Sequence, residues 1–525
     1  MTKEGSTSAF DPAGEWEPEL RDLARRRRIS AAMGGTAAIE KMHSQGKLTA
    51  RERIDKLFDK GTFREVGALT GKASYDESGE LKDFVPSNAV TGIGQIDGRR
   101  VSVSADDFTI RGGSSESTNS EKWIQAERYA YEARMPLVRL VDTAGGSVRL
   151  LEQQQSTKIP GYVNWPMAAL LNRVPVVGVA LGACAGLGAL KVLASHFSVM
   201  VRDTSQIFAA GPPVVKRAFG VDVHKNDLGG YMVHSRKSGI VDNEAADDVD
   251  AIQQARRFLS YLPINASEMP ARLTSSDPVD RAEDWLKDAI PRDSRRAYDV
   301  RKILDAVLDK GSTFEIGRYH GGSVVTALAR MDGIAVGVMA SNPAVAAGSM
   351  TLTAANKIER LIELCDTFHL PILNFVDQPG VMVGVEAEQQ GTLLSVMRVI
   401  RMMDRTTVPW MSVIMRRAFG LAGGMQGRKQ SGDGRSLNHR VAWPSARWGS
   451  IPIEGGVAAA YKRDIEAAAD PVERQAELEA YYGRLSSPFR TAERFGIADI
   501  IDPRGTRPLL CEWVHDAYNL LRSSV

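Results

Sequence analysis

Cysteine is scarce in this sequence, and its three residues, Cys184, Cys365 and Cys511, lie far apart without any Cys-x-x-Cys pair. A disulfide framework and a zinc ribbon are therefore excluded, and a reducing compartment fits this usage best. The eight His residues are scattered and form no His-Glu-x-x-His motif. We expect a cytoplasmic protein with no metal site.

Long hydrophobic runs and an excess of one charge are also absent. The longest membrane-like stretch, residues 174–190, contains four Gly and one Pro, and it is shorter than the about 20 apolar residues that a membrane-spanning helix needs. Lys and Arg total 66 against 64 Asp and Glu, so no overall field attracts nucleic acid or an anionic membrane surface. The N-terminus lacks the basic-then-apolar pattern of a signal peptide. We expect neither a membrane nor a nucleic-acid partner.

The informative feature is an internal repeat. MPLVRLVD (135–142) is matched by LPILNFVD (370–377), and the same displacement along the chain relates Lys122 to Lys357. The segments 185–188 and 419–422 match at almost the same displacement, and 57–61 matches 307–311 at a somewhat larger one. Each copy alternates apolar strands with helical patterns, which predicts a parallel α/β sheet with helical crossovers. One large α/β domain is the alternative.

The repeat defines the expected domains. A charged, helical N-terminal extension covers residues 1–40, the first copy residues 41–275 and the second copy residues 290–525. The polar segment between the copies, with Pro278 and Pro291, is the expected linker.

Glycine is plentiful, with 48 residues, and several glycines lie at predicted turns between a strand and a helix. In each copy a strand ends at small residues before a helix: GACAGLGALKVL (182–193) and RRAFGLAGGMQG (416–427). Two successive N–H groups at such a turn, with the positive end of the helix, can hold a developing oxyanion. The alternative is that these glycines only allow helix and strand to pack. No Gly-x-Ser-x-Gly elbow and no phosphate-binding lysine loop occurs, so a hydrolase or a nucleotide-binding function has no support.

Several segments resemble one known family. They include TARERI (49–54), AGPPVVKRAFG (210–220), DLGGYMVHSRKSGIVD (227–242) and DQPGVMVG (377–384). TARERI and the Leu-Gly-Gly-x3-His-x3-Ser-Gly pattern within 227–242 are the specific ones. Residues 40–525 resemble the carboxyltransferase (β) subunit of biotin-dependent acyl-CoA carboxylases of the propionyl-CoA and methylcrotonyl-CoA type.

This resemblance implies two tandem crotonase-type domains of the ClpP/crotonase superfamily, each an α/β fold. It implies that the first copy binds the acyl-CoA thioester and holds its enolate at Gly186-Leu187, while the second binds biotin at Gly420-Leu421. By the same resemblance, carboxybiotin releases CO2, the biotin nitrogen takes the α-proton and the enolate attacks CO2. Acyl-CoA contacts are expected from Gly112, Gly113, Ala144, Gly145 and Gly146, and biotin contacts from Pro379, Gly380 and Val381.

The resemblance also implies partners. The sequence has no biotinylation motif of the EAMKM kind and no ATP-binding loop, so biotin should be carried on a separate chain, a biotin carboxylase or biotin carboxyl carrier subunit. We expect a dimer, stacked into a hexamer, in which a second copy supplies the opposing site.

One departure from the family pattern stands out: Leu187 and Leu421 follow the turn glycines where the family has Gly or Ala. Which acyl-CoA is used stays open. The alternatives are the carboxyltransferase subunit of a decarboxylase or transcarboxylase, or a catalytically silent paralogue that only builds a carboxylase complex.

Overall fold

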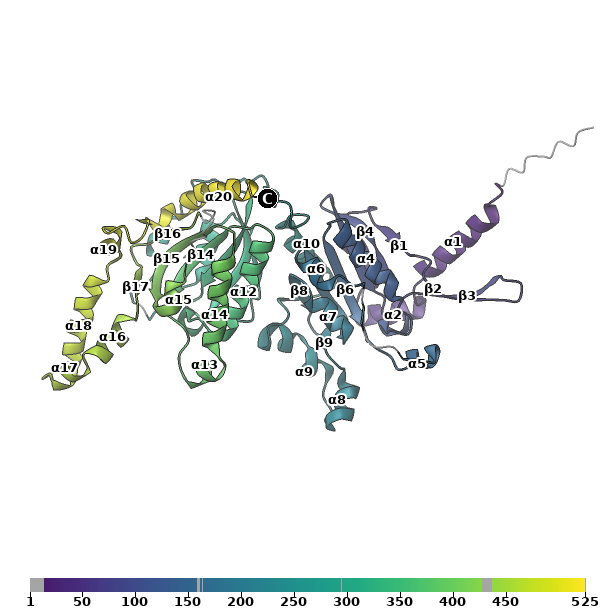
Figure 1. Ribbon diagram of the computed structural model, residues 1–525, viewed down its shortest axis with the longest axis horizontal. Helices are drawn as coiled ribbons and strands as arrows, with labels where there is room; N and C mark the ends of the chain where they lie inside the picture. Colours follow the sequence, from purple (N-terminus) through teal and green to yellow (C-terminus); the bar gives the residue numbers. More distant parts are fainter. Residues whose placement is uncertain (1–13, 158–160, 163, 294, 427–436, 525) are drawn as a thin grey trace, which may run out of the picture.

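The structure, a computed structural model, describes residues 14–157, 161–162, 164–293, 295–426 and 437–524. The first 13 residues of the expected extension lie outside this range. Two similar α/β units lie side by side, the first half of the chain in one and the second half in the other (Figure 1).

Each unit is built on one eight-stranded sheet. The first has the order β1-β4-β5-β6-β7-β8-β10, with β9 paired to β7. Its strands are β1 (Arg64–Val66), β4 (Ala89–Ile96), β5 (Arg99–Asp106), β6 (Leu137–Thr143), β7 (Val176–Ala185), β8 (Phe197–Val201), β9 (Gln206–Phe208) and β10 (Asn243–Ala245). A separate hairpin joins β2 (Gly71–Tyr75) and β3 (Leu81–Pro86).

The second sheet has the order β11-β12-β13-β14-β15-β16-β18, with β17 paired to β15. Its strands are β11 (Phe314–Ile316), β12 (Val324–Met331), β13 (Ile334–Ser341), β14 (Ile372–Gln378), β15 (Trp410–Phe419), β16 (His439–Ala442), β17 (Arg447–Gly449) and β18 (Asp499–Ile500). Strands β4, β5, β6 and β7 reappear in the same order as β12, β13, β14 and β15, at the displacements found between the sequence segments. The predicted repeat is therefore confirmed.

Both sheets are mixed, where the sequence pattern predicted parallel ones. β4 and β5 are antiparallel, as are β12 and β13, because a tight hairpin turn joins each pair. Asp97-Gly98 and Asp332-Gly333 both have positive φ, between 47° and 76°, the backbone that a type I′ turn requires. The later strands of each unit run parallel.

Helices cover both sheets. Those of the first half are α1 (Glu17–Ala31), α2 (Thr36–Ser44), α3 (Ala50–Leu57), α4 (Ser120–Glu132), α5 (Arg149–Gln154), α6 (Met167–Leu171), α7 (Leu187–Leu193), α8 (Pro212–Phe219), α9 (Lys225–Gly229) and α10 (Asp248–Ser260). Those of the second are α11 (Val300–Val307), α12 (Leu352–Thr367), α13 (Val385–Gln389), α14 (Thr392–Arg405), α15 (Gly420–Gly424), α16 (Ile453–Ala460), α17 (Lys462–Ala467), α18 (Pro471–Leu485), α19 (Pro488–Ala492) and α20 (Thr506–Arg522).

The repeat begins further upstream than the strands alone suggest. Helix α3 starts at a capping box of Thr49 and Glu52, which satisfies two otherwise unpaired N–H groups, and it reappears in the second half as α11. The expected boundary at residue 40 falls inside α2. Between α10 and α11 the expected linker is held against the second half, because Arg281 donates to the Ala306 carbonyl of α11 at 2.6 Å.

Aromatic side chains join the two halves. Phe197 of β8 lies 5.4 Å from Phe314 of β11 between ring centroids, and the His196 ring lies 4.9 Å from that of Phe368. The three phenylalanines belong to an apolar cluster that continues from one sheet to the other. The halves of one chain are therefore packed against each other.

Candidate functional site

The first predicted turn lies where β7 runs into α7. Gly186 has φ 57° and ψ −111° and is exposed, and α7 begins at Leu187 with no side-chain cap. The Gly186 N–H donates to the carbonyl of Phe208 in β9 at 3.0 Å. The prediction of two free successive N–H groups is therefore wrong at Gly186, because the sheet already uses that donor. The N–H of Leu187 remains, since the first N–H groups of a helix have no partner within it.

The second turn repeats the first. β15 ends at Phe419, and Gly420 has φ 62° at the start of α15, which again has no side-chain cap. Leu421 is 51% exposed. A Cβ on Gly420 would lie 3.6 Å from the carbonyl oxygen of Ser450, the one described atom within 4 Å of it outside the adjoining chain. Both glycines thus adopt a backbone that other residues rarely take, at equivalent strand-to-helix turns with open space beside them.

The five residues expected to contact acyl-CoA form two loops that lie against the first turn. The N–H of Ala144 donates to the carbonyl of Gly112 at 2.9 Å. A Cβ on Gly113 would lie 2.5 Å from the Asp142 carbonyl oxygen, and one on Gly145 would lie 2.9 Å from that of Ala185. These glycines are required because the loops approach each other's backbone too closely for a side chain.

Gly146 is the open member of this group. It is exposed, no described atom lies within 4 Å of its Cβ position, and no described group accepts a hydrogen bond from its N–H. The N–H of Gly145, in contrast, donates to Thr143 Oγ1 at 3.0 Å. Gly146 and Leu187 therefore supply the unused N–H groups at the first site.

The three residues expected to contact biotin lie against the second turn. Gly380 has φ 138°, and a Cβ there would lie 3.9 Å from the Phe419 carbonyl oxygen. Its N–H donates to Gln378 Oε1 at 3.1 Å, and its carbonyl accepts the N–H of Met350 at 2.9 Å. Val381 forms a parallel bridge with Met350, and Pro379 precedes both. The structure thus brings each predicted group to its own turn.

Buried carboxylates beneath these loops were not predicted to matter. Asp142 is fully buried, with Lys47 Nζ at 2.6 Å and Arg53 Nη1 at 3.0 Å. Its counterpart Asp377 accepts from Arg416 Nη2 at 2.9 Å and Arg417 Nε at 2.6 Å. The repeat could have marked both carboxylates, since it aligns Asp142 with Asp377. It could not have marked their cationic partners, because these come from different parts of the chain.

Burial also shifts titrations around these carboxylates. Desolvation raises the pKa of Asp106, next to Asp142, although Lys191 Nζ lies 3.5 Å from it. Burial, together with the Asp377 charge, raises the pKa of the Tyr298 phenol well above its usual value. Among the described residues no group of three or more His, Cys, Asp or Glu is placed to hold a metal ion. Within that same part of the chain, every helix is too short or too polar to cross a membrane.

Known proteins share this architecture. Residues 41–519 match the family model of the carboxyl transferase domain. The chain is 35% identical over 492 residues to the propionyl-CoA carboxylase carboxyltransferase subunit of Haloferax mediterranei, a match that covers 94% of each chain. It is 32% identical over 479 residues to the methylmalonyl-CoA decarboxylase subunit alpha of Veillonella parvula, covering 91% of each.

A solved structure extends the likeness. The 12S subunit of transcarboxylase, described as a hexamer assembly with methylmalonyl-CoA bound, superposes with a TM-score of 0.86 at 30% identity over 97% of this chain and 96% of that one. The fold is accordingly the crotonase-like fold that the resemblance implied. With the family match over most of its length and the same pair of α/β units, the chain belongs to the carboxyl transferase family, which includes the carboxyltransferase subunits of biotin-dependent acyl-CoA carboxylases and transcarboxylases.

Proposed function

We propose that this chain is a carboxyltransferase subunit that moves CO2 from carboxybiotin to the α or vinylogous γ carbon of an acyl-CoA. The observation that carries the proposal is the twice-repeated turn, Gly186-Leu187 and Gly420-Leu421, each an uncapped helix start at a glycine of positive φ. Backbone N–H groups fixed in this way stabilise developing negative charge without rearranging during the reaction.

In the first half, the donors assigned to the thioester enolate are the N–H groups of Leu187 and Gly146. This assignment replaces Gly186, whose N–H is bound to Phe208. Gly112, Gly113, Ala144 and Gly145 hold the loop of Gly146 beside the turn, so that its N–H has a fixed direction. The absence of a Cβ at Gly146 leaves room for the thioester carbon chain.

In the second half, the N–H of Leu421 is assigned to the ureido carbonyl of biotin, and Pro379, Gly380 and Val381 form the adjacent wall. The space beside Gly420 fits a planar ring, because its Cβ position meets one atom of the described residues within 4 Å. When bound and carboxylated, biotin supplies the CO2 and a nitrogen that accepts the α-proton. The chain's part is to orient the two reactants and polarise their carbonyls.

The partners follow from this arrangement. We assign biotin to a separate carrier subunit. In Figure 1, α5, α8 and α13 project on the same side of the two halves, and we infer that the two turns of one chain do not face each other. A second copy is needed to oppose them, and we propose a dimer stacked into a hexamer.

Exposed apolar side chains support this assembly. Val214, Phe219 and Val221 on and after α8, and Val383, Val385 and Leu394 around α13 and α14, are all more than half exposed. Such clusters on the projecting elements are typical of surfaces that a partner covers. The three cysteines are free and buried, which agrees with a cytoplasmic location.

The test is carboxyl transfer by the purified chain. A carboxylated biotin carrier and a panel of acyl-CoA thioesters, from acetyl-CoA to methylcrotonyl-CoA, are supplied, and the carboxylated thioesters are measured by mass spectrometry. Transfer to at least one thioester is expected. The names of the decarboxylase and transcarboxylase relatives favour a second candidate, transfer in the reverse direction, which the same assay detects with a malonyl-type thioester as donor. Inactivity in both directions would favour the silent paralogue.

A further inference from the structure

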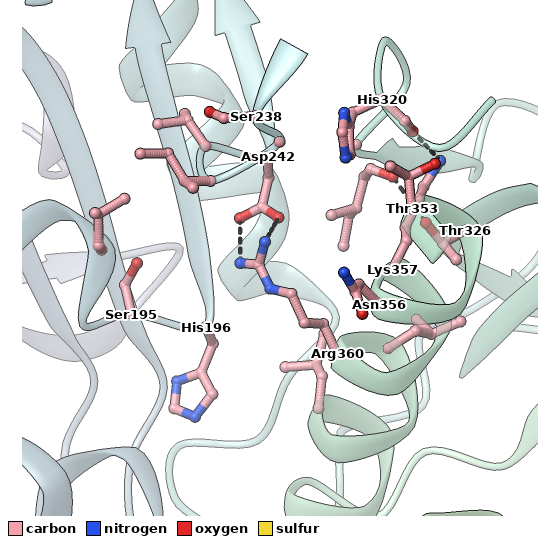
Figure 2. Close-up of a pocket in the computed structure, with 18 residues that line it drawn as sticks. Ser195, His196, Ser238, Asp242, His320, Thr326, Thr353, Asn356, Lys357 and Arg360 are labelled. Carbon is pink, nitrogen blue, oxygen red and sulfur yellow. Dashed lines mark hydrogen bonds and ion pairs between the residues drawn. The ribbon is translucent and has the colours of Figure 1, made fainter. Parts of the chain in front are cut away.

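A cavity lies between the two halves of the chain, away from both turns. Its volume is about 460 Å³, within the range of about 300–1,000 Å³ that small-molecule sites occupy. The first half contributes the last residue of α7, Leu193, with Ser195 and His196 after it, and residues 238–242. The second half contributes residues of β11, β12 and α12 (Figure 2). The proposed carboxyl transfer uses none of these residues.

The specific motif 227–242 forms part of this cavity wall. Gly239 has φ 65°, and a Cβ there would lie 2.1 Å from Cδ2 of His320, so only glycine allows the ring from the other half to approach. Asp242, at the end of the motif, meets Arg360 of α12 through two contacts, 2.9 Å to Nη1 and 3.1 Å to Nη2. This ion pair crosses the cavity from one half to the other (Figure 2).

Among the described polar side chains that line the cavity, most of the groups without a hydrogen-bond partner are donors. The Asp242 carboxylate is taken by Arg360 and by the Ser198 N–H at 2.8 Å. Lys357 Nζ donates to the carbonyls of His320 at 3.2 Å and Val324 at 2.9 Å, which leaves one of its three N–H bonds. Among the described residues, no acceptor is bonded to the Asn356 side-chain NH2 or to the Arg360 Nε. Such a set of donors recognises an anion.

Apolar side chains complete the cavity. Leu193 and Ile240 belong to the first half, and Ile316, Leu361 and Leu364 belong to the second. Lys357 lines the same cavity. Burial lowers its pKa to about 8, so at pH 7 it still carries its charge, in a place where that charge is poorly solvated. A bound anion would compensate for this lost solvation.

From these contacts we propose that the cavity binds a small amphipathic anion, an aliphatic carboxylate, with its headgroup at Lys357, Asn356 and Arg360 and its chain against the leucine and isoleucine side chains. The ligand touches both halves at once and the end of α7 opposite the Gly186 turn. Because these contacts exist only in this arrangement of the halves, the ligand stabilises it. This inference does not depend on the proposed carboxyl transfer.

The experiment is calorimetric titration of the full-length protein in its native assembly with octanoate, hexanoate and inorganic phosphate. Saturable binding is expected for octanoate, with hexanoate weaker and phosphate weaker by at least about tenfold, because phosphate lacks the apolar part. Lys357→Met should weaken octanoate binding at least about tenfold, since it removes the buried charge.

The repeat supplies a matched control. Lys122 is the counterpart of Lys357 on α4, and burial lowers its pKa to about 8 as well, but it does not line the cavity. Lys122→Met should bind octanoate like the unchanged protein. If Lys357→Met does not fold, Asn356→Leu replaces it, because that side chain is exposed and its loss leaves the core intact.

Three results would overturn the proposal. The first is no saturable binding of any probe. The second is octanoate binding that neither Lys357→Met nor Asn356→Leu weakens, which would place the site elsewhere, including at the acyl-CoA turn. The third is phosphate binding as tight as octanoate, which would remove the aliphatic carboxylate as ligand.

Discussion

The two halves share a backbone but balance the charge of their buried carboxylates differently. In the first half, Asp142 is bound by Lys47 and Arg53, which come from the segment at and before α3, far upstream. In the second half, Asp377 is bound by Arg416 and Arg417 of the neighbouring strand β15 and by the Tyr298 hydroxyl at 3.1 Å. The repeat has kept the acid and the strand that carries it, while the compensating charge has come from different elements.

The loops beside the two turns also differ between the halves. Ala144, Gly145 and Gly146 correspond in the repeat to Pro379, Gly380 and Val381. The first loop keeps an exposed Gly146 with an unused N–H. In the second loop Val381 takes the place of Gly146, and its bridge to Met350 uses the Gly380 carbonyl and the Met382 N–H, so among the described residues the Val381 N–H has no acceptor either. Both loops therefore keep an unbonded N–H beside their turn, and they differ in the side chain at that position, which is absent at Gly146 and branched at Val381.

The strongest test of the separate roles proposed for the two halves replaces the turn glycines. Gly186→Val and Gly420→Val place a branched side chain at a positive φ beside the remaining N–H donor, which should misdirect that donor. Gly186→Val should lower acyl-CoA turnover by about 10²–10³-fold, the usual cost of losing an oxyanion donor, and should leave decarboxylation of the carboxylated carrier intact. Gly420→Val should abolish both reactions, measured in parallel assays.

Thermal unfolding of both variants is the control. Among the described residues, the nearest neighbour of each Cβ lies at 3.6 Å or more, so both proteins should fold. If the variants are unfolded, the glycines are needed for the structure. If Gly186→Val slows both reactions equally, the two halves do not have separate roles.

The buried carboxylates give the next largest effect. Asp142→Asn removes the counter-charge of Lys47 and leaves Arg53 with Asp248 alone, and Asp377→Asn removes the counter-charge of Arg416 and Arg417. Each change should lower the free energy of unfolding by about 3–5 kcal/mol. Hydrogen exchange separates the halves. Asp142→Asn should increase exchange in residues 47–57, because the ion pairs to Asp142 hold this segment against the first sheet. Asp377→Asn should instead increase exchange in β15. Identical exchange patterns would contradict the difference in charge compensation.

The turns could be predicted from the sequence because they depend on local features. A glycine between a strand and a helix, found again at the equivalent place in the second copy, specifies both Gly186 and Gly420 without knowledge of the rest of the fold. The positions of Gly145 and Gly380 followed from the same repeat. The Gly186 N–H bond to Phe208 could not be predicted, because β9 returns to the edge of β7 only after α7 and β8. The cavity between the halves was also missed, since its walls come from segments that are far apart in the sequence.

A pH titration tests the contact that joins the halves. Burial, reinforced by the positive charges of Arg139 and Arg360, lowers the pKa of His196 from 6.5 to about 4. The folded protein therefore holds His196 neutral, while the unfolded chain takes up a proton below pH 6.5. Its contribution is fully present above pH 6.5 and is lost as the pH falls towards 4, by roughly 2–3 kcal/mol in all.

Chemical denaturation at pH 7 and pH 4.5 measures the free energy of unfolding at each pH. The difference between the two values should be smaller in His196→Asn by roughly 2–3 kcal/mol, and the difference that remains comes from other acid-sensitive groups. An unchanged pH dependence in His196→Asn would show that its ring is not held neutral against Phe368.

The smallest effect is expected from the two leucines that depart from the family pattern. Leu187→Gly and Leu421→Gly keep the N–H that each turn presents and remove only the side chain, which at Leu421 is 51% exposed. Carboxyl transfer should therefore change by less than about tenfold, because the donor that stabilises the oxyanion is unaltered. Of the two, Leu187→Gly should show the larger change in preference among acyl-CoA thioesters, since its turn is the one assigned to the acyl group, and Leu421→Gly should leave that preference as it is. The acyl-CoA panel measures both effects as ratios of kcat/KM. A large gain of activity in either variant, from a protein that is inactive with its leucines, would instead identify the leucines as the block and the natural chain as the silent paralogue.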